Sequence, residues 1–207
     1  MIMVSFLVIY TINKIFVLNI NTMPIKFDLS RFSNNNIFIE TGTYLGDGIK
    51  AALKAGFKQV YSIELDERRY NNCVKRFQNN KNVHIINGNS GIVLFDLMKK
   101  INEPCTFFLD AHYCGESLTL GVAIADKWCP MNEELEAINN HHINTHTILI
   151  DDMRCINLQH IDQKTQKPVG FPGKDNLIKK LKEINPSYKL EYLQGHIKDD
   201  VLLAHIN

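Results

Sequence analysis

The sequence predicts an α/β fold built on a mostly parallel sheet with helices on both faces. From residue 36 onward, strand-like and helix-like segments alternate through five units, which is the pattern of a parallel sheet covered on both sides. At the end of the chain, the strand-like segments 188–193 and 201–206 are separated only by the short polar stretch 195–200. Because no helix fits between these two segments, they must form an antiparallel hairpin.

The composition is that of a soluble globular protein with room for one ordinary domain. Of its 207 residues, 45% are hydrophobic and 22% are charged. The formal net charge is +1 and no block of like charge is present, which disfavours a nucleic-acid-binding protein. The cysteines form no C-x-x-C pair, so we expect reduced thiols in a cytoplasmic protein rather than a disulfide framework. They are Cys73, Cys105, Cys114, Cys129 and Cys155.

Residues 1–22 differ from the rest of the chain in being strongly apolar. Asn13 and Lys14 interrupt this stretch, and its uncharged part is shorter than the roughly 20 residues that a membrane-spanning helix needs. It also lacks the early basic residue and the small-residue cleavage site of a signal peptide. We therefore divide the chain into an N-terminal extension, 1–22, and a domain, 23–207. The extension is a leading segment, an extra packed element or a weak anchor.

The first half of the domain contains three strand–helix units. The segment 47–55 has helical spacing and is followed by Gly56, which suits the end of a helix. Asp66 can cap a helix over 67–77, and Ser90 can cap a helix that runs to about residue 101. The strands of these units are expected at 36–41, 59–65 and 83–87.

The second half contains two more units and two long loops. Strands are expected at 105–109 and 147–150. Pro130 suits the first turn of a helix that runs to about residue 139, and another helix is expected over 176–184. The loops span 112–129 and 151–173.

The strongest functional signal is the motif E-T-G-T-Y-L-G-D-G, residues 40–48, between the first strand and its helix. Gly42 and Gly46 allow a tight turn and a close approach of the backbone to a ligand, and the helix behind them offers free N–H groups. Gly48 is interpreted as a third flexible point. The G-x-x-x-G spacing leaves room for a methionine moiety, whereas dinucleotide-binding proteins use G-x-G-x-x-G around a pyrophosphate. An ordinary tight turn would also explain these glycines.

Two further positions suit a nucleoside. Glu64 ends the second strand about 20 residues after Gly42, where an acidic side chain can accept hydrogen bonds from ribose hydroxyls. The turn N-G-N-S, residues 87–90, closes the third strand, and there Asn89 and Ser90 suit an adenine ring. A plain turn followed by a serine cap is the alternative interpretation.

Acidic residues follow the fourth and fifth strands. Asp110 comes directly after 105–109, and Asp151 and Asp152 come after 147–150. If these strands are neighbours, the three carboxylates converge and repel one another, unless a cation neutralises them or one takes up a proton. Oxygen ligands favour Mg²⁺, Ca²⁺ or Mn²⁺, which indicates a divalent-metal site. The alternative is that Asp151 or Asp152 caps the backbone of the loop.

Taken in order, these motifs resemble those of class I S-adenosylmethionine (SAM)-dependent methyltransferases, from about residue 36 to the end of the chain. The resemblance implies a seven-stranded sheet of order 3-2-1-4-5-7-6 in which strand seven is antiparallel. Asn89 departs from it, since the wider family often has an aspartate at that position. The resemblance assigns SAM binding to Glu40, Gly42, Gly46, Glu64, Asn89, Ser90 and Asp110.

More narrowly, Asp110 with the Asp151–Asp152 pair resembles the metal-dependent O-methyltransferases, which include catechol, caffeoyl-CoA and macrocin types. In those enzymes a strand-four aspartate and a D-D or D-N pair hold Mg²⁺, so the resemblance implies a metal on Asp110, Asp151 and Asp152. The loop 112–129 matches none of these subfamilies, so it does not identify the methyl acceptor.

The chemistry of methyl transfer suggests further roles. SAM carries its methyl group on a sulfonium, so the protein must hold donor and acceptor in line and help remove a proton. Asp110 and His112 are the candidate catalytic residues, and His112 is the candidate general base because imidazole titrates near neutrality. His112 could instead make a structural hydrogen bond, or join Cys114, Cys129 and a further ligand around zinc. Arg154 is interpreted as a surface charge rather than a substrate anchor.

The leading hypothesis is an O-methyltransferase that acts on a small hydroxylated molecule, with a sugar or glycan precursor as first candidate. An enzyme that methylates nucleic acid or protein would need a basic groove or an added recognition domain. A non-catalytic SAM-binding module is disfavoured by the intact glycine motif, and a nicotinamide-dependent enzyme by the glycine spacing and the final hairpin. The sequence is compatible with an oligomer.

Overall fold

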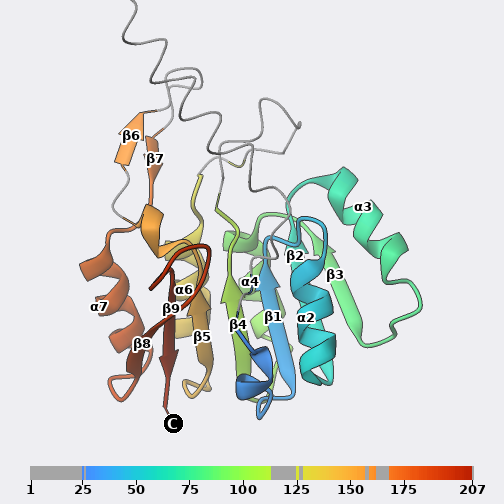
Figure 1. Ribbon diagram of the computed structural model, residues 1–207, viewed down its shortest axis with the longest axis horizontal. Helices are drawn as coiled ribbons and strands as arrows, with labels where there is room; N and C mark the ends of the chain where they lie inside the picture. Colours follow the sequence, from blue (N-terminus) through green and yellow to red (C-terminus); the bar gives the residue numbers. More distant parts are fainter. Residues whose placement is uncertain are drawn as a thin grey trace, which may run out of the picture.

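The computed structural model describes residues 27–112, 128–156, 159–161 and 168–206, together with Ile25 and Ala125 (Figure 1). The extension 1–22, Cys114 and most of the expected loop 112–129 lie outside the described residues. The described part of the chain forms a seven-stranded sheet and a small two-stranded sheet.

The main sheet has the predicted topology. Its order is β3-β2-β1-β4-β5-β9-β8, and β9 runs antiparallel to both of its neighbours while the inner strands pair in parallel. With β8 and β9 as the sixth and seventh strands, this confirms the order 3-2-1-4-5-7-6. The strands are β1 (Ile37–Thr41), β2 (Gln59–Glu64), β3 (Val83–Asn87), β4 (Cys105–Leu109), β5 (Thr147–Ile150), β8 (Lys189–Leu193) and β9 (Val201–His205).

Helices cover both faces of this sheet, as predicted (Figure 1). None of the helices in the described ranges is long and apolar enough to cross a membrane. The helices are α2 (Asp47–Ala55), α3 (Glu67–Arg76), α4 (Ser90–Met98), α6 (Met131–Asn139) and α7 (Lys174–Ile184), with short 3₁₀ turns η1 (Leu29–Phe32) and η2 (Met153–Cys155).

The two faces are built from alternate residues of the same strands. In β5, Ile148 and Ile150 are buried on the face covered by α4, α6 and α7, whereas Leu149 is buried on the face covered by η1, α2 and α3. Ile39 and Phe38 of β1 divide in the same way. Because both faces are covered, successive residues of these strands are apolar, as in residues 37–39 of β1 and 148–150 of β5.

Apart from shifts of one residue at several ends, the structure differs from the sequence prediction in four places. The helix expected to run to about residue 101 ends at Met98. Asn89, not Ser90, caps α4, because its Oδ1 atom accepts the N–H of Gly91 at 3.0 Å. The helix expected over 176–184 begins earlier, at Lys174, directly after Gly173. The expected loop 151–173 contains η2 and the paired strands β6 (Gln159–Ile161) and β7 (Pro168–Gly170). Segments of three residues are too short to leave a periodic pattern in the sequence.

Candidate functional site

The parallel strands end in register at one edge of the sheet, which we call the carboxyl edge. Thr41 of β1 pairs with Ile63 of β2 and with Leu109 of β4, and Leu109 in turn pairs with Ile150 of β5. The predicted site residues that come next in each chain segment therefore emerge along this edge. They are Gly42, Glu64, Asp110 and Asp151.

The glycine motif makes a tight loop at this edge. Gly42 and Gly46 have left-handed backbones, with φ of +84° and +81°. A Cβ atom on Gly42 would lie 2.5 Å from the carbonyl oxygen of Asp110, so this loop packs directly on the end of β4. Gly46 is the N-cap of α2 and, having no side chain, caps none of the N–H groups in the first turn of this helix.

Glu40 is buried beneath this loop. A Cβ atom on Gly48 would come within 1.5 Å of Glu40 Oε1, so Gly48 makes room for the carboxylate and does not serve as a flexible point. The Ser62 hydroxyl donates to Glu40 Oε2 at 2.7 Å and lies 2.6 Å from the Thr43 hydroxyl. Burial raises the pKa of Glu40 to about 8, although the Ser62 hydrogen bond opposes the shift.

Glu64 ties the glycine loop to the end of β2. Its Oε2 atom accepts the N–H of Tyr44 at 2.8 Å, and its Oε1 atom accepts the N–H of Asp66 at 2.9 Å. Burial raises the pKa of Glu64, although these two N–H groups favour the carboxylate. Each carboxylate oxygen has a second lone pair, so Glu64 can still accept hydrogen bonds from a ligand.

Asn89 and Ser90 make structural contacts at the start of α4. The Asn89 amide oxygen is used in capping the helix, and Ser90 is buried with its hydroxyl against Glu134. A role of these two residues in binding adenine therefore stays a prediction.

Glu134 of α6 is a fully buried carboxylate that the motifs did not point to. Burial raises its pKa to about 7, while the hydroxyls of Ser90 and Thr41 and the imidazole of His112 lower it. A sequence signal does exist. Glu134 lies three residues after Met131 and four before Ile138, so helical spacing puts it on the apolar side of α6.

His112 lies between two of the predicted acids. Its side chain is only 5% exposed, its Nε2 atom contacts Asp152 Oδ2, and its Nδ1 atom is 3.5 Å from Asp110 Oδ1. The ring of Phe171 packs 5.0 Å away, centroid to centroid. Asp110 is itself fixed to β1, because its N–H donates to the carbonyl and the hydroxyl of Thr41.

Asp151 and Asp152 are both buried at the end of β5. Asp151 Oδ1 accepts the N–H of Asp152 at 2.9 Å, and Asp152 has a left-handed backbone with φ of +59°. Burial and the charge of Asp152 raise the pKa of Asp151. Burial alone would also raise the pKa of Asp152, but His112 and Arg154 outweigh it and the net shift is downward.

Arg154 is not the plain surface charge expected from the sequence. Its Nη1 atom forms ion pairs with Asp152 and with Asp200, which lies at the start of the final strand of the sheet. Asp200 was not among the predicted site residues. Its position was readable from topology, because an antiparallel β9 beside β5 must begin at the carboxyl edge.

The three aspartates predicted to hold a metal do not form one cluster. Asp110 groups with His112 and Asp152, whereas Asp151 groups with Asp152 and Asp200, each group having ligand atoms within 4.8 Å of one another. Asp152 is shared between the two groups. Cys129, which the zinc alternative requires, belongs to neither group.

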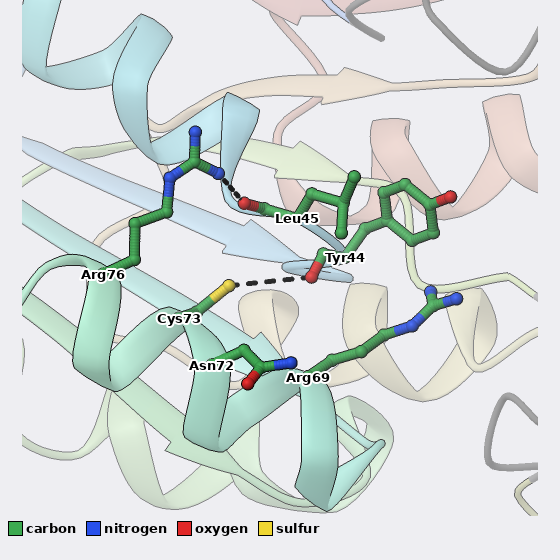
Figure 2. Close-up of a pocket in the computed structure, with 6 residues that line it drawn as sticks. All are labelled: Tyr44, Leu45, Arg69, Asn72, Cys73 and Arg76. Atoms are coloured by element: carbon green, nitrogen blue, oxygen red, sulfur yellow. Dashed lines mark hydrogen bonds between the residues drawn. The ribbon is translucent and has the colours of Figure 1, made fainter.

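A separate pocket of about 330 Å³ lies between the glycine loop and α3. Figure 2 shows the Tyr44 ring beside the Arg69 guanidinium, which lies 4.2 Å from the ring centroid. Arg76 donates to the carbonyl of Leu45, and the Cys73 thiol donates to that of Tyr44 at 3.6 Å. None of the aspartates of the carboxyl edge lines this pocket. The pocket therefore lies apart from the group of acidic side chains.

Solved structures with the same architecture include methyltransferases. No protein-family model matches the sequence, and no curated protein matches it either. An O-methyltransferase from Bacillus cereus in complex with SAH is 14% identical, with a TM-score of 0.53 over 86% of this chain and 77% of that one. The SAH-bound methyltransferase PaMTH1 from Podospora anserina is also 14% identical, with a TM-score of 0.52 over 85% and 74% of the two chains. DesVI from Streptomyces venezuelae is 8% identical, with a TM-score of 0.54 over 86% and 87%. The chain thus has the Rossmann-like fold of class I methyltransferases.

Proposed function

We propose that the protein is a SAM-dependent methyltransferase that transfers a methyl group to a hydroxyl of a small molecule. The observation that carries this proposal is the contact between Gly42 and the end of β4. It places the loop suited to SAM directly beside Asp110, and through Asp110 beside His112 and Asp152. A methyl donor and a group able to accept a proton would then meet at one point of the carboxyl edge.

The residues at this edge fit the parts of SAM. Glu40 is a buried carboxylate whose ionised form a positively charged group would favour. Gly42 and Gly46 let a ligand approach the backbone, and Glu64 retains acceptor capacity for ribose hydroxyls. We assign Asn89, Ser90 and Asp110 to the same site. SAM, when bound, supplies an electrophilic methyl group on a sulfonium.

His112 is the group best placed to accept the proton of the acceptor hydroxyl. The Asp152 carboxylate bonds its Nε2 atom and fixes the ring, which leaves Nδ1 directed toward Asp110. Because Nδ1 makes no hydrogen bond of ordinary geometry with the described residues, this nitrogen can take up a proton. A sugar or glycan precursor is the acceptor class that we propose to test first.

A divalent cation is the second part of the proposal. Asp110, His112 and Asp152 offer one nitrogen and two carboxylate ligands. Asp151 holds the backbone of Asp152, because its carboxylate accepts the N–H of Asp152. A mixed nitrogen and oxygen set suits Mn²⁺ as well as Mg²⁺, and such an ion would lower the pKa of a bound hydroxyl. His112 cannot act as ligand and as base with the same lone pair, so the need for a metal decides between its two roles.

Calorimetry with SAM, SAH and NAD tests the proposal at its base. We expect SAM and SAH to bind and NAD not to bind. Activity toward hydroxylated acceptors would then be measured with excess chelator and after addition of Mg²⁺ or Mn²⁺. Full activity in chelator would reject the metal and keep His112 as the base. Failure of the wild-type protein to bind SAM or SAH would reject the whole proposal.

A further inference from the structure

The guanidinium of Arg154 lies inside the group of carboxylates at the carboxyl edge. Arg154 follows Asp152 by two residues in η2, and its side chain is 31% exposed. Its Nη1 atom contacts Asp152 Oδ1 on one side and Asp200 Oδ2 on the other. Asp152 and Asp200 therefore share one positively charged donor.

The Asp200 carboxylate is held in place for this contact by burial and by backbone hydrogen bonds. It is fully buried, and its carboxylate also accepts the N–H groups of Arg154 at 3.0 Å, His196 at 3.0 Å and Ile197 at 3.4 Å. A Cβ atom on Gly195 would lie 2.8 Å from Asp200 Cβ, so the turn of the final hairpin needs a glycine to admit this side chain. The end of the chain is thus shaped around the contact with Arg154.

Charge explains why a cation is needed here. Asp151, Asp152 and Asp200 present ligand atoms within 4.8 Å of one another, and the side chains of Asp151 and Asp200 are buried while that of Asp152 is 13% exposed. Unit charges at such distances repel strongly in a protein interior unless an opposite charge lies among them or one of the acids takes up a proton. Among the residues that the structure describes, Arg154 is the cation that contacts this group.

We propose that Arg154 is the resident cation of the Asp151–Asp152–Asp200 group and thereby a positioning residue for His112. The guanidinium takes the place that a metal ion would otherwise have between Asp152 and Asp200. It holds Asp152 Oδ1, so that the other oxygen, Oδ2, faces His112 Nε2. A divalent ion then has only the Asp110–His112–Asp152 group left among the described residues.

Counting bound Mn²⁺ tests this inference. Mn²⁺ that remains free in solution gives a resolved electron paramagnetic resonance signal, so the number of ions bound per chain can be titrated. We expect Arg154→Met to bind one more Mn²⁺ than the wild-type protein, or to bind it about tenfold more tightly. Arg154→Lys keeps the charge and should behave as the wild type. Lys99→Met is the matched control, since it removes one positive charge from an exposed pair with Asp96.

A second measurement covers a variant that folds poorly. A ligand that binds only the folded state raises the melting temperature, so Mn²⁺ should stabilise Arg154→Met more than the wild type. It should not do so in Arg154→Met/Asp200→Asn, which lacks one carboxylate of the group. An Arg154→Met protein that stays unfolded in millimolar Mn²⁺, or that gains no more from Mn²⁺ than Lys99→Met does, would overturn the inference.

The inference deepens the proposed function, because it concerns the group that holds His112, but the two can fail separately. Failure of the wild-type protein to bind SAM would reject methyl transfer. It would not affect the expected difference in bound Mn²⁺ between the wild type and Arg154→Met. Equal Mn²⁺ binding by the wild type and Arg154→Met would reject the resident cation and leave SAM binding unchanged.

Discussion

Buried polar groups have different partners at the two edges of the sheet. At the carboxyl edge, the described acidic side chains outnumber the described groups that neutralise them, and burial raises the pKa of Glu40 to about 8 and that of Glu134 to about 7. Several backbones there are left-handed, among them Gly42 and Asp152. Strained backbones and perturbed acids gather where a protein binds or reacts.

At the opposite edge, two neighbouring histidines have a hydrogen-bond partner for each ring nitrogen. His146 is fully buried, and its Nδ1 atom accepts the N–H of Cys105 at 3.0 Å. The remaining proton of His146 must then lie on Nε2, which donates to His141 Nδ1 at 3.0 Å, and His141 Nε2 donates to the carbonyl of Ile101 at 3.0 Å. Each nitrogen has one suitable partner, so this arrangement needs no ligand to complete it.

The contrast identifies which buried polar groups exist for folding and which exist for a ligand. A complete set of partners stabilises the fold as it stands, as at His146. An excess of one charge, as at Asp151, Asp152 and Asp200, is stable only with a cation or a proton. The comparison can therefore be tested by perturbing each edge and asking whether stability or ligand binding changes.

The largest expected effect is that of Gly42→Ala at the carboxyl edge. The new Cβ atom would lie 2.5 Å from the backbone oxygen of Asp110 at a φ of +84°, and backbone cannot move aside as a flexible side chain can. Strain of ~1–2 kcal/mol and overpacking of ~1–3 kcal/mol together predict a loss of roughly 4 kcal/mol in the free energy of unfolding. SAM binding should be lost as well. Urea denaturation and calorimetry measure the two effects.

Gly56→Ala is the control for that substitution. Gly56 has a similar φ of +94°, but a Cβ atom there would meet nothing within 4 Å. We expect a loss of only ~1–2 kcal/mol from backbone strain and unchanged SAM affinity. If both variants lost the same stability, backbone strain alone would explain the effect of Gly42→Ala. The contact of Gly42 with the end of β4 would then not contribute to the loss.

Most of the fold was predictable because its signals are local. Apolar runs and capping residues predicted the strands of the main sheet and its helices, and the final hairpin predicted the antiparallel β9. What failed lies in segments too short for a periodic pattern or at the end of a helix. The short strands β6 and β7 stabilise each other only as a pair, and the cap of α4 shifted by one residue to Asn89.

The candidate site was predictable only as far as the strand ends. Position alone shows that Asp110 and Asp151 lie at one edge, but side-chain partners depend on rotamers and on residues elsewhere. The pairing of Arg154 with Asp200 joins positions 46 residues apart. Glu40 and Gly48 could have been linked from the sequence, since a buried acid beside a helix start needs a small residue there.

The next largest effect concerns pH and the opposite edge. Burial and the neighbouring His141 lower the pKa of His146 to about 4 from its ordinary value of 6.5. Between these values the unfolded chain binds a proton that the folded protein does not, so stability falls as the pH drops from 6.5 to 4. At 1.36 kcal/mol per unit, the loss is about 3 kcal/mol.

The difference in unfolding free energy between the wild type and His146→Ala isolates this contribution from that of the buried acids. The advantage of the wild type should shrink as the pH falls from 6.5 to 4 and be constant above 7. A constant advantage across the whole range would contradict the matched arrangement at His146.

The smallest expected effect is that of Glu64→Gln, which separates two roles of Glu64 at the carboxyl edge: support of the glycine loop and binding of SAM. Its carboxylate accepts the N–H groups of Tyr44 and Asp66, and we propose that it also accepts ribose hydroxyls. Glu64→Gln keeps one acceptor oxygen, so it should retain part of the loop support but weaken SAM binding by ~1–3 kcal/mol, the range for a lost charged hydrogen-bond partner. Thr43→Val perturbs the same loop without touching the carboxylate of Glu64, because it removes the hydroxyl that faces Ser62. Calorimetry with SAM and urea denaturation on both variants distinguish the two roles. If Glu64→Gln lost stability but bound SAM as tightly as the wild type, Glu64 would belong with the structural groups of the opposite edge.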